Sequence, residues 1–100
     1  MFDFDLVEGF EWDVGNARKN VVKHGVSQSE AEQVFFNKPL LLFDDERHGT
    51  VEPRLHAYGK SDDGRHLQVS FTLRNDGRLV RVISARVMSR KERAVYDQEI

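Results

Sequence analysis

The sequence lacks cysteine and has few residues of the kinds that mark a secreted mini-protein or a membrane protein. Its 100 residues include no Cys, two Pro and one Trp. The absence of Cys excludes disulfides, thiolate metal sites and a cysteine nucleophile, and it is typical of a reducing compartment. The longest apolar run, Pro39–Phe43, is far shorter than the roughly 20 residues that span a bilayer. Residues 1–5 lack the basic region of a secretion signal, so we expect a cytoplasmic protein without a membrane segment.

An excess of one charge is also lacking. Lys plus Arg number 15 and Asp plus Glu number 17, which leaves a net charge of −2. This balance excludes an acidic disordered tail and a non-specific coat for nucleic acids. The two halves nevertheless differ, because residues 51–100 hold 10 of the 15 basic residues and eight of these are Arg. The planar guanidinium suits phosphate and carboxylate, so the second half predicts a local anionic partner.

The local signals predict one α+β domain over residues 1–100. Asp13 and Gly25 bound a first helix, whose apolar stripe runs through Val14, Ala17, Val21 and Val22. Capping boxes that begin at Ser27 and Ser89 start two further helices. The expected elements are a short strand at 10–12, two N-terminal helices within 13–38, an antiparallel sheet of about four strands (40–43, 54–60, 65–74 and 78–87) and a C-terminal helix from 89.

The first strand connection sets which side chains share a face of the sheet. In residues 65–74 the apolar side chains alternate with polar ones, so the apolar set faces the core. A three-residue loop over 62–64, with Gly64 in the left-handed position, keeps charged side chains off that core. It predicts the outward-facing pairs Lys60–His66, Tyr58–Gln68 and His56–Ser70.

The second connection decides between two arginines. The same three-residue turn at Asn75–Gly77 places Val69 opposite Ile83, Leu67 opposite Ala85 and His66 opposite Arg86. Arg86 then joins the polar face with Arg54, while Arg81 goes to the core side opposite Phe71. A two-residue turn would exchange the two arginines. We favour Arg86, because it shares the turn chemistry of the first connection and gives the better apolar match.

The polar face gathers residue types that suit RNA cleavage without a metal or cofactor. Such cleavage needs a base for the 2′-hydroxyl, cations for the developing phosphorane charge and an acid for the leaving 5′-oxygen. We expect Arg54 and Arg86 to hold the phosphate. The other site residues expected on this face are His56 and Lys60 for proton transfer, and Tyr58, His66 and Gln68 for RNA contacts. His66 or Tyr58 could also transfer protons.

Each signal also has a structural interpretation. Lys23 and His24 end a helix, where basic residues interact favourably with the macrodipole, and capping is the preferred role. Asp44–Glu46 with His48 could hold a divalent cation, but a solvated acidic loop is the better interpretation because no further ligand spacing supports a site. The alternative function is a non-catalytic protein-binding module, whose polar face docks the acidic segment of a partner.

Several blocks together resemble the BrnT toxin family in the family's own order. They are residues 10–13, Asn20, residues 23–27, Glu30-Ala31, Val34-Phe35, Arg54, Gly59, residues 83–86, residues 89–93 and Tyr96. The resemblance implies a RelE-like fold and a ribonuclease that inhibits translation. Carried over by position, its candidate residues are Arg54 and Arg86. The resemblance adds Arg90 and Arg93 of the basic stretch 90–93, Lys23 and His24 as RNA contacts.

The resemblance also implies partners. The expected antitoxin is a BrnA-type ribbon-helix-helix protein that forms a heterotetramer with the toxin and supplies all contacts to DNA. We expect it to bind the arginine face, where cations are gathered. In the alternative function, the chain is an antitoxin-bound co-repressor without nuclease activity. The sequence departs from the family at Asn16, often Lys, and at Pro53, often acidic, so Glu52 would have to supply that carboxylate.

Overall fold

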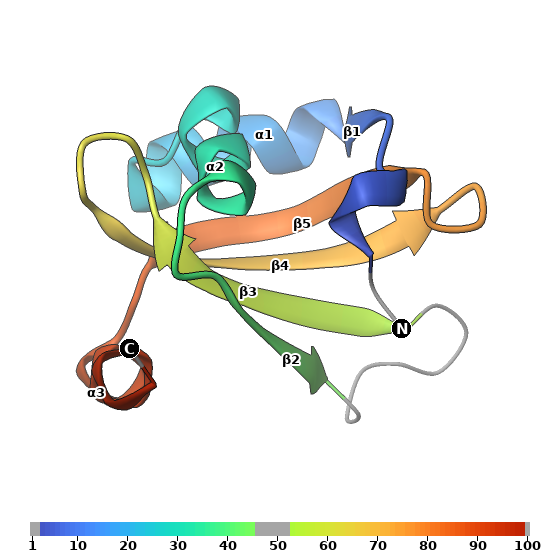
Figure 1. Ribbon diagram of the computed structural model, residues 1–100. Helices are drawn as coiled ribbons and strands as arrows, with labels where there is room; N and C mark the ends of the chain where they lie inside the picture. Colours follow the sequence, from blue (N-terminus) through green and yellow to red (C-terminus); the bar gives the residue numbers. More distant parts are fainter. Residues whose placement is uncertain (1–2, 46–52, 100) are drawn as a thin grey trace.

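The structure, a computed structural model, describes residues 3–45 and 53–99 (Figure 1). In chain order its elements are η1 (Phe4–Leu6), β1 (Gly9–Trp12), α1 (Val14–His24), α2 (Gln28–Gln33), η2 (Val34–Phe36), β2 (Leu41–Asp45), β3 (Arg54–Lys60), β4 (His66–Arg74), β5 (Leu79–Val87) and α3 (Arg90–Gln98). The elements η1 and η2 are short 3-10 helices. Within these ranges no helix is long and apolar enough to cross a membrane.

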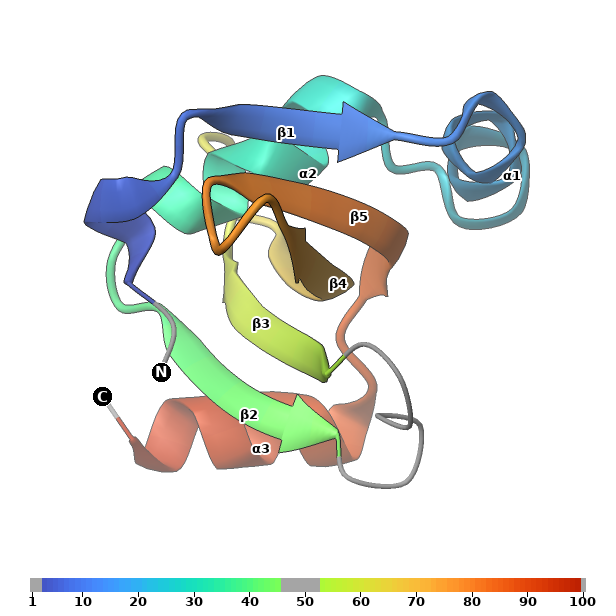
Figure 2. The ribbon, with the colours of Figure 1, turned by 90° about the vertical axis from the view of Figure 1, so that its right-hand side faces the viewer.

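The strands form a single mixed sheet in the order β1-β5-β4-β3-β2. Strands β2 to β5 pair antiparallel, as expected, whereas β1 pairs in parallel with β5. The expectation of about four strands is therefore corrected to five, because the short segment at Gly9–Trp12 joins the sheet. The expected α+β class is confirmed. Figure 2 shows the sheet from one end, with β1 at the top and β2 at the bottom.

The helix ends follow local chemistry. The Asp13 carboxylate accepts a hydrogen bond at the start of α1, and Gly25 ends this helix in the left-handed region at φ 66°. Ser27 caps α2, and the expected capping box is formed at Ser89 before α3. The second helix is shorter than expected, because α2 gives way to the 3-10 turn η2 at Val34.

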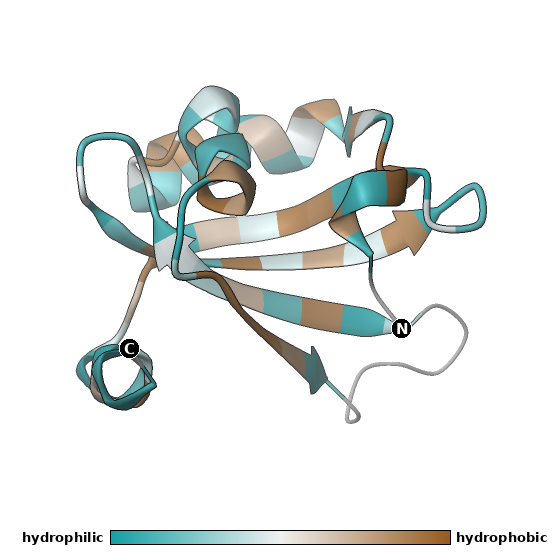
Figure 3. Ribbon diagram, viewed as in Figure 1, coloured by the Kyte–Doolittle hydropathy of each residue, from teal (hydrophilic) through white to brown (hydrophobic). Residues whose placement is uncertain are grey.

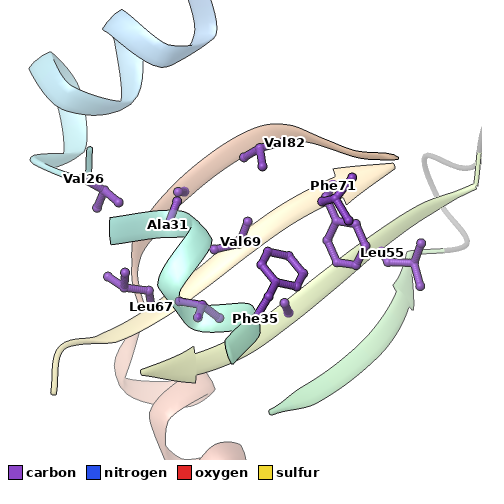
Figure 4. Packing of buried hydrophobic residues seen from close by; sticks show 12 residues of the cluster. Val26, Ala31, Phe35, Leu55, Leu67, Val69, Phe71 and Val82 are labelled. Atoms are coloured by element: carbon purple, nitrogen blue, oxygen red, sulfur yellow. The ribbon is translucent and has the colours of Figure 1, made fainter. Parts of the chain in front are cut away.

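The core lies between the sheet and the segment α2–η2 (Figure 4). Phe35 of η2 meets Phe71 of β4 edge to face, with ring centroids 5.1 Å apart. Along β3 buried and half-buried residues alternate, and Figure 3 shows the matching alternation of hydropathy. The buried members of the cluster are Val26, Ala31, Val34, Phe35, Leu55, Ala57, Leu67, Val69, Phe71, Val80, Val82 and Ala85.

The apolar stripe expected on α1 does not face this core. Val14 and Val22 are 82% and 80% exposed, whereas Asn20 is buried. The Ala85 N–H donates a hydrogen bond of 3.2 Å to Asn20 Oδ1. Because β1 pairs with β5 only as far as Val82, the edge of β5 beyond it is covered by α1 (Figure 2). A buried backbone donor needs an acceptor, which Asn supplies and Val cannot.

The register between β3 and β4 is the expected one. Gly64 adopts φ 83° in the connection. The pairs include Lys60–His66, Tyr58–Gln68, His56–Ser70 and Arg54–Thr72. The charged and aromatic side chains of β3 therefore lie on the face away from the core.

The turn between β4 and β5 differs from the expected type I turn. Asn75 and Asp76 both adopt positive φ, at 53° and 55°, ahead of Gly77. The closing pair is Arg74–Leu79, so the loop is one residue longer than expected. The expected pairs Val69–Ile83, Leu67–Ala85 and His66–Arg86 are replaced by Val69–Ala85, Leu67–Val87 and Gln68–Arg86.

A β-bulge at Ile83 then changes the alternation along β5. On the turn side Val82 pairs with Phe71, and on the other side Ser84 pairs with Ser70, so Ile83 is the additional residue. Such a residue reverses the faces of the side chains that follow it.

Both arginines of β5 therefore lie on the face away from the core. Arg86 pairs with Gln68, as part of the expected polar face, and Arg81 pairs with Thr72. The expectation that Arg81 lies on the core side opposite Phe71 is wrong, because Val82 takes that place.

We expect Gly59→Ala to destabilise the fold, because a Cβ at this position would lie 2.8 Å from Val34 Cγ1 in the core. Overpacking of this kind costs about 1–3 kcal/mol, which urea unfolding would measure. Gly9→Ala is the matched control in β1, since its Cβ would meet Leu79 at an ordinary 3.6 Å. Equal losses for the two variants would contradict the close packing of β3 on η2.

Candidate functional site

The sheet face away from α2 and η2, which we call the outer face, carries the candidate site. Pairing lays its side chains in rows across β3, β4 and β5. The Arg86 row holds Tyr58, Gln68 and Arg86; the His56 row holds His56, Ser70 and Ser84; the Arg54 row holds Arg54, Thr72 and Arg81. Lys60 and His66 form a shorter row next to the Arg86 row. Adjacent rows are about 7 Å apart, because each is two residues further along the strands.

Arg86 is held by a carboxylate of α3. Its Nη1 and Nη2 donate to the two carboxylate oxygens of Glu92, each at 2.7 Å. The backbone N–H of Ser89 donates to the same carboxylate at 2.8 Å. The hydrogen bonds between the two groups raise the pKa of Arg86 and lower the pKa of Glu92. No acceptor in residues 3–45 or 53–99 takes the Nε–H of Arg86, so this edge of the guanidinium can receive an anion.

His56 lies on the outer face but is engaged through both ring nitrogens. Its Nε2 lies 2.9 Å from Asp45 Oδ2, and its Nδ1 lies 2.8 Å from Ser70 Oγ and 2.6 Å from the side-chain amide of Gln68. A neutral ring that donates from Nε2 accepts at Nδ1. While these contacts hold, neither nitrogen is available for a substrate proton.

The protonation states of Tyr58 and His66 suit one to donate a proton and the other to accept one. Burial, and then the charge of Glu92, raises the pKa of Tyr58, so its hydroxyl remains protonated at neutral pH. Burial, and then the charge of Arg93, lowers the pKa of His66, so its ring remains neutral there. The first can donate a proton and the second can accept one. They are diagonal neighbours on paired strands, typically about 7–8 Å apart.

The Arg54 row supplies further cations. Arg54 has no hydrogen bond or ion pair with any residue that the structure describes, and the same holds for the Lys60 ammonium. Arg81 Nη1 donates to Glu11 Oε1 of β1 at 2.8 Å. Between the two arginines lies Thr72, whose buried Oγ1 has no hydrogen-bond partner in the described part of the chain. This row could therefore bind an anion through two guanidinium groups and a hydroxyl.

Helix α3 closes one end of the outer face (Figure 1). Tyr96 packs edge to face on His66, with centroids 5.5 Å apart, and its hydroxyl donates to the Pro39 carbonyl at 2.6 Å. Arg90 and Arg93 of α3 line an open cavity of about 450 Å³ together with His66. These three expected RNA contacts are thus brought together.

Lys23 and His24 are not brought to the outer face by any described contact. They form the last turn of α1, immediately before Gly25, and α1 lies along the edge of β5 (Figure 2). Among hydrogen bonds and ion pairs within the described ranges, none joins them to the residues of the three rows. Their position is consistent with the capping role that the sequence favoured.

The acidic segment after β2 is only partly described. Asp45 ends β2 and contacts His56, whereas Glu46, His48 and the substitute carboxylate Glu52 lie outside the described residues. Among the residues that are described, no group of three or more His, Asp or Glu side chains could hold a metal ion.

Sequence reasoning missed three residues of the site. Glu92 was recognisable as a helix cap, but its contact with Arg86 depends on where the chain turns after β5. Asp45 was assigned to a solvated loop, although it meets His56 across the β2–β3 pair. Arg81 was assigned to the core, because nothing in the local sequence marks the bulge at Ile83.

Comparisons with known proteins agree on one family. The family model described as "Ribonuclease toxin, BrnT, of type II toxin-antitoxin system" matches residues 12–92. The 1.1 Å crystal structure of the Brucella abortus ribonuclease toxin, BrnT, is similar in fold, with a TM-score of 0.63 and 23% sequence identity. The match covers 82% of this chain and 97% of that chain. No curated protein matches the chain.

We expect Glu92→Gln to weaken the fold by about 1 kcal/mol at pH 7. Glutamine keeps the capping box at Ser89 but loses the charge that pairs with Arg86. Because the folded-state pKa of Glu92 is lowered from 4.5, the ionised carboxylate contributes stability above pH 4.5. This contribution is lost as the pH falls through the lowered folded-state value. Urea unfolding at several pH values would measure the difference from wild type.

The control for this prediction is Glu99→Gln, an exposed carboxylate at the other end of α3. Its effect on the free energy of unfolding should stay within about 0.5 kcal/mol. A loss in Glu92→Gln that does not change with pH would contradict an origin in charge.

Proposed function

The chain belongs to the BrnT family of ribonuclease toxins of type II toxin–antitoxin systems, and on this basis we propose that its outer face cleaves RNA. Membership implies an RNA substrate and an antitoxin partner. One observation supports placing the RNA-cleaving site on this face: Arg54, Arg81 and Arg86 share it with Tyr58 and His66. The groups that bind a phosphodiester thus lie beside groups that can move its protons.

The arginines of the two outer rows serve different phosphates in this proposal. Arg54 and Arg86 are two strands apart and four residues apart along the strands, which corresponds to about 17 Å between their Cα atoms. Two guanidinium groups at this separation cannot easily hold one phosphate together. We therefore assign Arg86 to the reacting phosphate, and Arg54 with Arg81 and Thr72 to a neighbouring one.

The chemical step takes place between the Arg86 row and His66 of the neighbouring row. The RNA 2′-oxygen attacks the adjacent phosphorus, the bond from phosphorus to the 5′-oxygen breaks, and the products are a 2′,3′-cyclic phosphate and a 5′-hydroxyl. His66 accepts the 2′-hydroxyl proton, and Tyr58 donates a proton to the leaving oxygen. The free Nε edge of Arg86 binds the negative charge that develops on the phosphorane. Solvent returns both groups to their starting protonation states.

The other expected site residues take supporting roles. Lys60 places a positive charge beside His66, and Gln68 lies between Tyr58 and Arg86. His56 is assigned to positioning rather than proton transfer, because Asp45, Ser70 and Gln68 engage its ring. Arg90 and Arg93 bind flanking RNA phosphates at the end of the face.

We propose metal independence from this assignment, and the other finer properties of the system from the family resemblance. Cleavage is metal-independent, because guanidinium groups supply the positive charge at the reacting phosphate. The toxin has a RelE-like fold, acts in the cytoplasm and inhibits translation by degrading RNA. Its antitoxin is a BrnA-type ribbon-helix-helix protein that binds DNA and assembles with the toxin as a heterotetramer.

We expect the two arginine variants to affect different kinetic constants. Arg86→Ala should lower kcat at least 100-fold, because it removes donors that act on the transition state. Arg54→Ala should mainly raise KM, by about tenfold, because it removes a charge-assisted contact to substrate. Cleavage of a fluorescent RNA by purified protein in EDTA would measure both constants.

Arg78→Ala is the matched control, since Arg78 is an exposed arginine at the β4–β5 turn, outside the three rows. It should leave both constants unchanged. If folded wild-type protein leaves RNA intact, with and without EDTA, yet binds the product of the adjacent gene, the chain is a binding module. If EDTA abolishes the activity, metal independence is wrong, but the assignment of the chain as a ribonuclease stands.

A further inference from the structure

Helix α1 presents three valines to solvent and buries the polar Asn20 against the sheet. Val14, Val21 and Val22 are 82%, 50% and 80% exposed, while Asn20 is buried against β5. A helix that serves only its own domain shows the opposite pattern, with the apolar stripe inside. The outward valines are therefore not explained by the fold of this chain.

The four residues Val14, Arg18, Val21 and Val22 form one continuous surface, which we call the valine face. A period of 3.6 residues per turn places them within an arc of about 100°. From Val14 to Val22 the face extends about 12 Å along the helix. These dimensions match two turns of a second helix packed against it.

The charged side chains of α1 itself are all basic, and the acidic Asp13 precedes them as the N-cap. Helix α1 contains Arg18, Lys19 and Lys23 and no acidic residue. None of these three cations makes an ion pair within residues 3–45 and 53–99. On the outer face, Arg81 and Arg86 are both paired with glutamates, whereas Arg54 and Lys60 have no ion pair with a described residue. The valine face therefore favours a surface that is apolar and acidic.

We propose that the valine face of α1 is the docking surface for an acidic amphipathic helix of the antitoxin. This inference rests on the proposed function, which supplies the partner, and it gives that partner a location. Valines gain free energy when apolar side chains cover them, and carboxylates beside those side chains complement Arg18 and Lys19. RNA would complement the charges, but valine offers bases neither stacking nor hydrogen bonds.

The sequence predicted that the antitoxin binds the outer face, but this face is a less favourable site for an acidic segment than α1. Arg86 already binds Glu92 through two hydrogen bonds, and Arg81 already binds Glu11. An antitoxin carboxylate would have to displace these internal carboxylates. Arg54 and Lys60 also lack such a partner among the described residues, but on α1 the unpaired cations lie beside three exposed valines.

The test measures the affinity of purified toxin variants for the purified product of the adjacent gene, by titration calorimetry at two salt concentrations. Val14→Glu with Val22→Glu should raise Kd at least tenfold, and Val14→Thr with Val22→Thr should raise it less. Arg18→Glu should raise Kd and reduce its dependence on salt. Leu6→Glu is the matched control, since Leu6 is 58% exposed in η1, and its Kd should equal that of wild type.

RNA cleavage by each free variant is measured in parallel and should equal that of wild type. If the α1 variants bind the antitoxin normally, the docking surface is wrong and the ribonuclease proposal stands. The inference also fails if Arg54→Ala weakens antitoxin binding and the α1 variants do not. It fails too if the α1 variants lose RNA binding but keep antitoxin binding, or if their only effect is to convert a toxin dimer to a monomer. If wild-type toxin does not bind the antitoxin, the proposed partner itself is wrong.

Discussion

The outer face depends on one additional residue in β5. Strict alternation would separate Arg81 from Arg86, which are five positions apart, and would place one of them in the core. The bulge at Ile83 lets Val80 and Val82 face the core on one side of it and Ala85 on the other. The same change of phase brings both arginines to the opposite face. Core packing and the gathering of cations therefore have a common cause.

Two of the gathered cations, Arg81 and Arg86, have carboxylate partners, which come from both ends of the chain. Glu11 of β1 reaches Arg81 and Glu92 of α3 reaches Arg86, at 2.8 and 2.7 Å. These contacts hold the guanidinium groups in place and leave one edge of Arg86 open. They also set the environment of Tyr58, whose pKa is raised by burial and by Glu92. Positioning, charge balance and proton chemistry thus depend together on the Arg86–Glu92 pair.

The two basic surfaces of the protein differ in how much of their charge is satisfied. On the outer face, two of the three row arginines are paired internally, which suits a polyanion that competes for specific donors. On α1 the basic side chains surround exposed valines, which suits a protein surface that buries apolar area. A toxin with two such surfaces could be held by its antitoxin at a place other than the one that binds RNA.

The sequence by itself determined the features that depend on neighbouring residues. The caps at Asp13, Gly25 and Ser89 and the β3–β4 register were predictable, because hydrogen bonding and backbone sterics act over a few residues. Only the tertiary structure decided the bulge at Ile83, the parallel pairing of β1 and the outward valines of α1. Each of these depends on contacts between distant segments: a free strand edge that needs an acceptor, or a core that needs Val82 and Ala85 together. A local sequence pattern cannot predict these features, because they depend on which distant segments pack together in the folded chain.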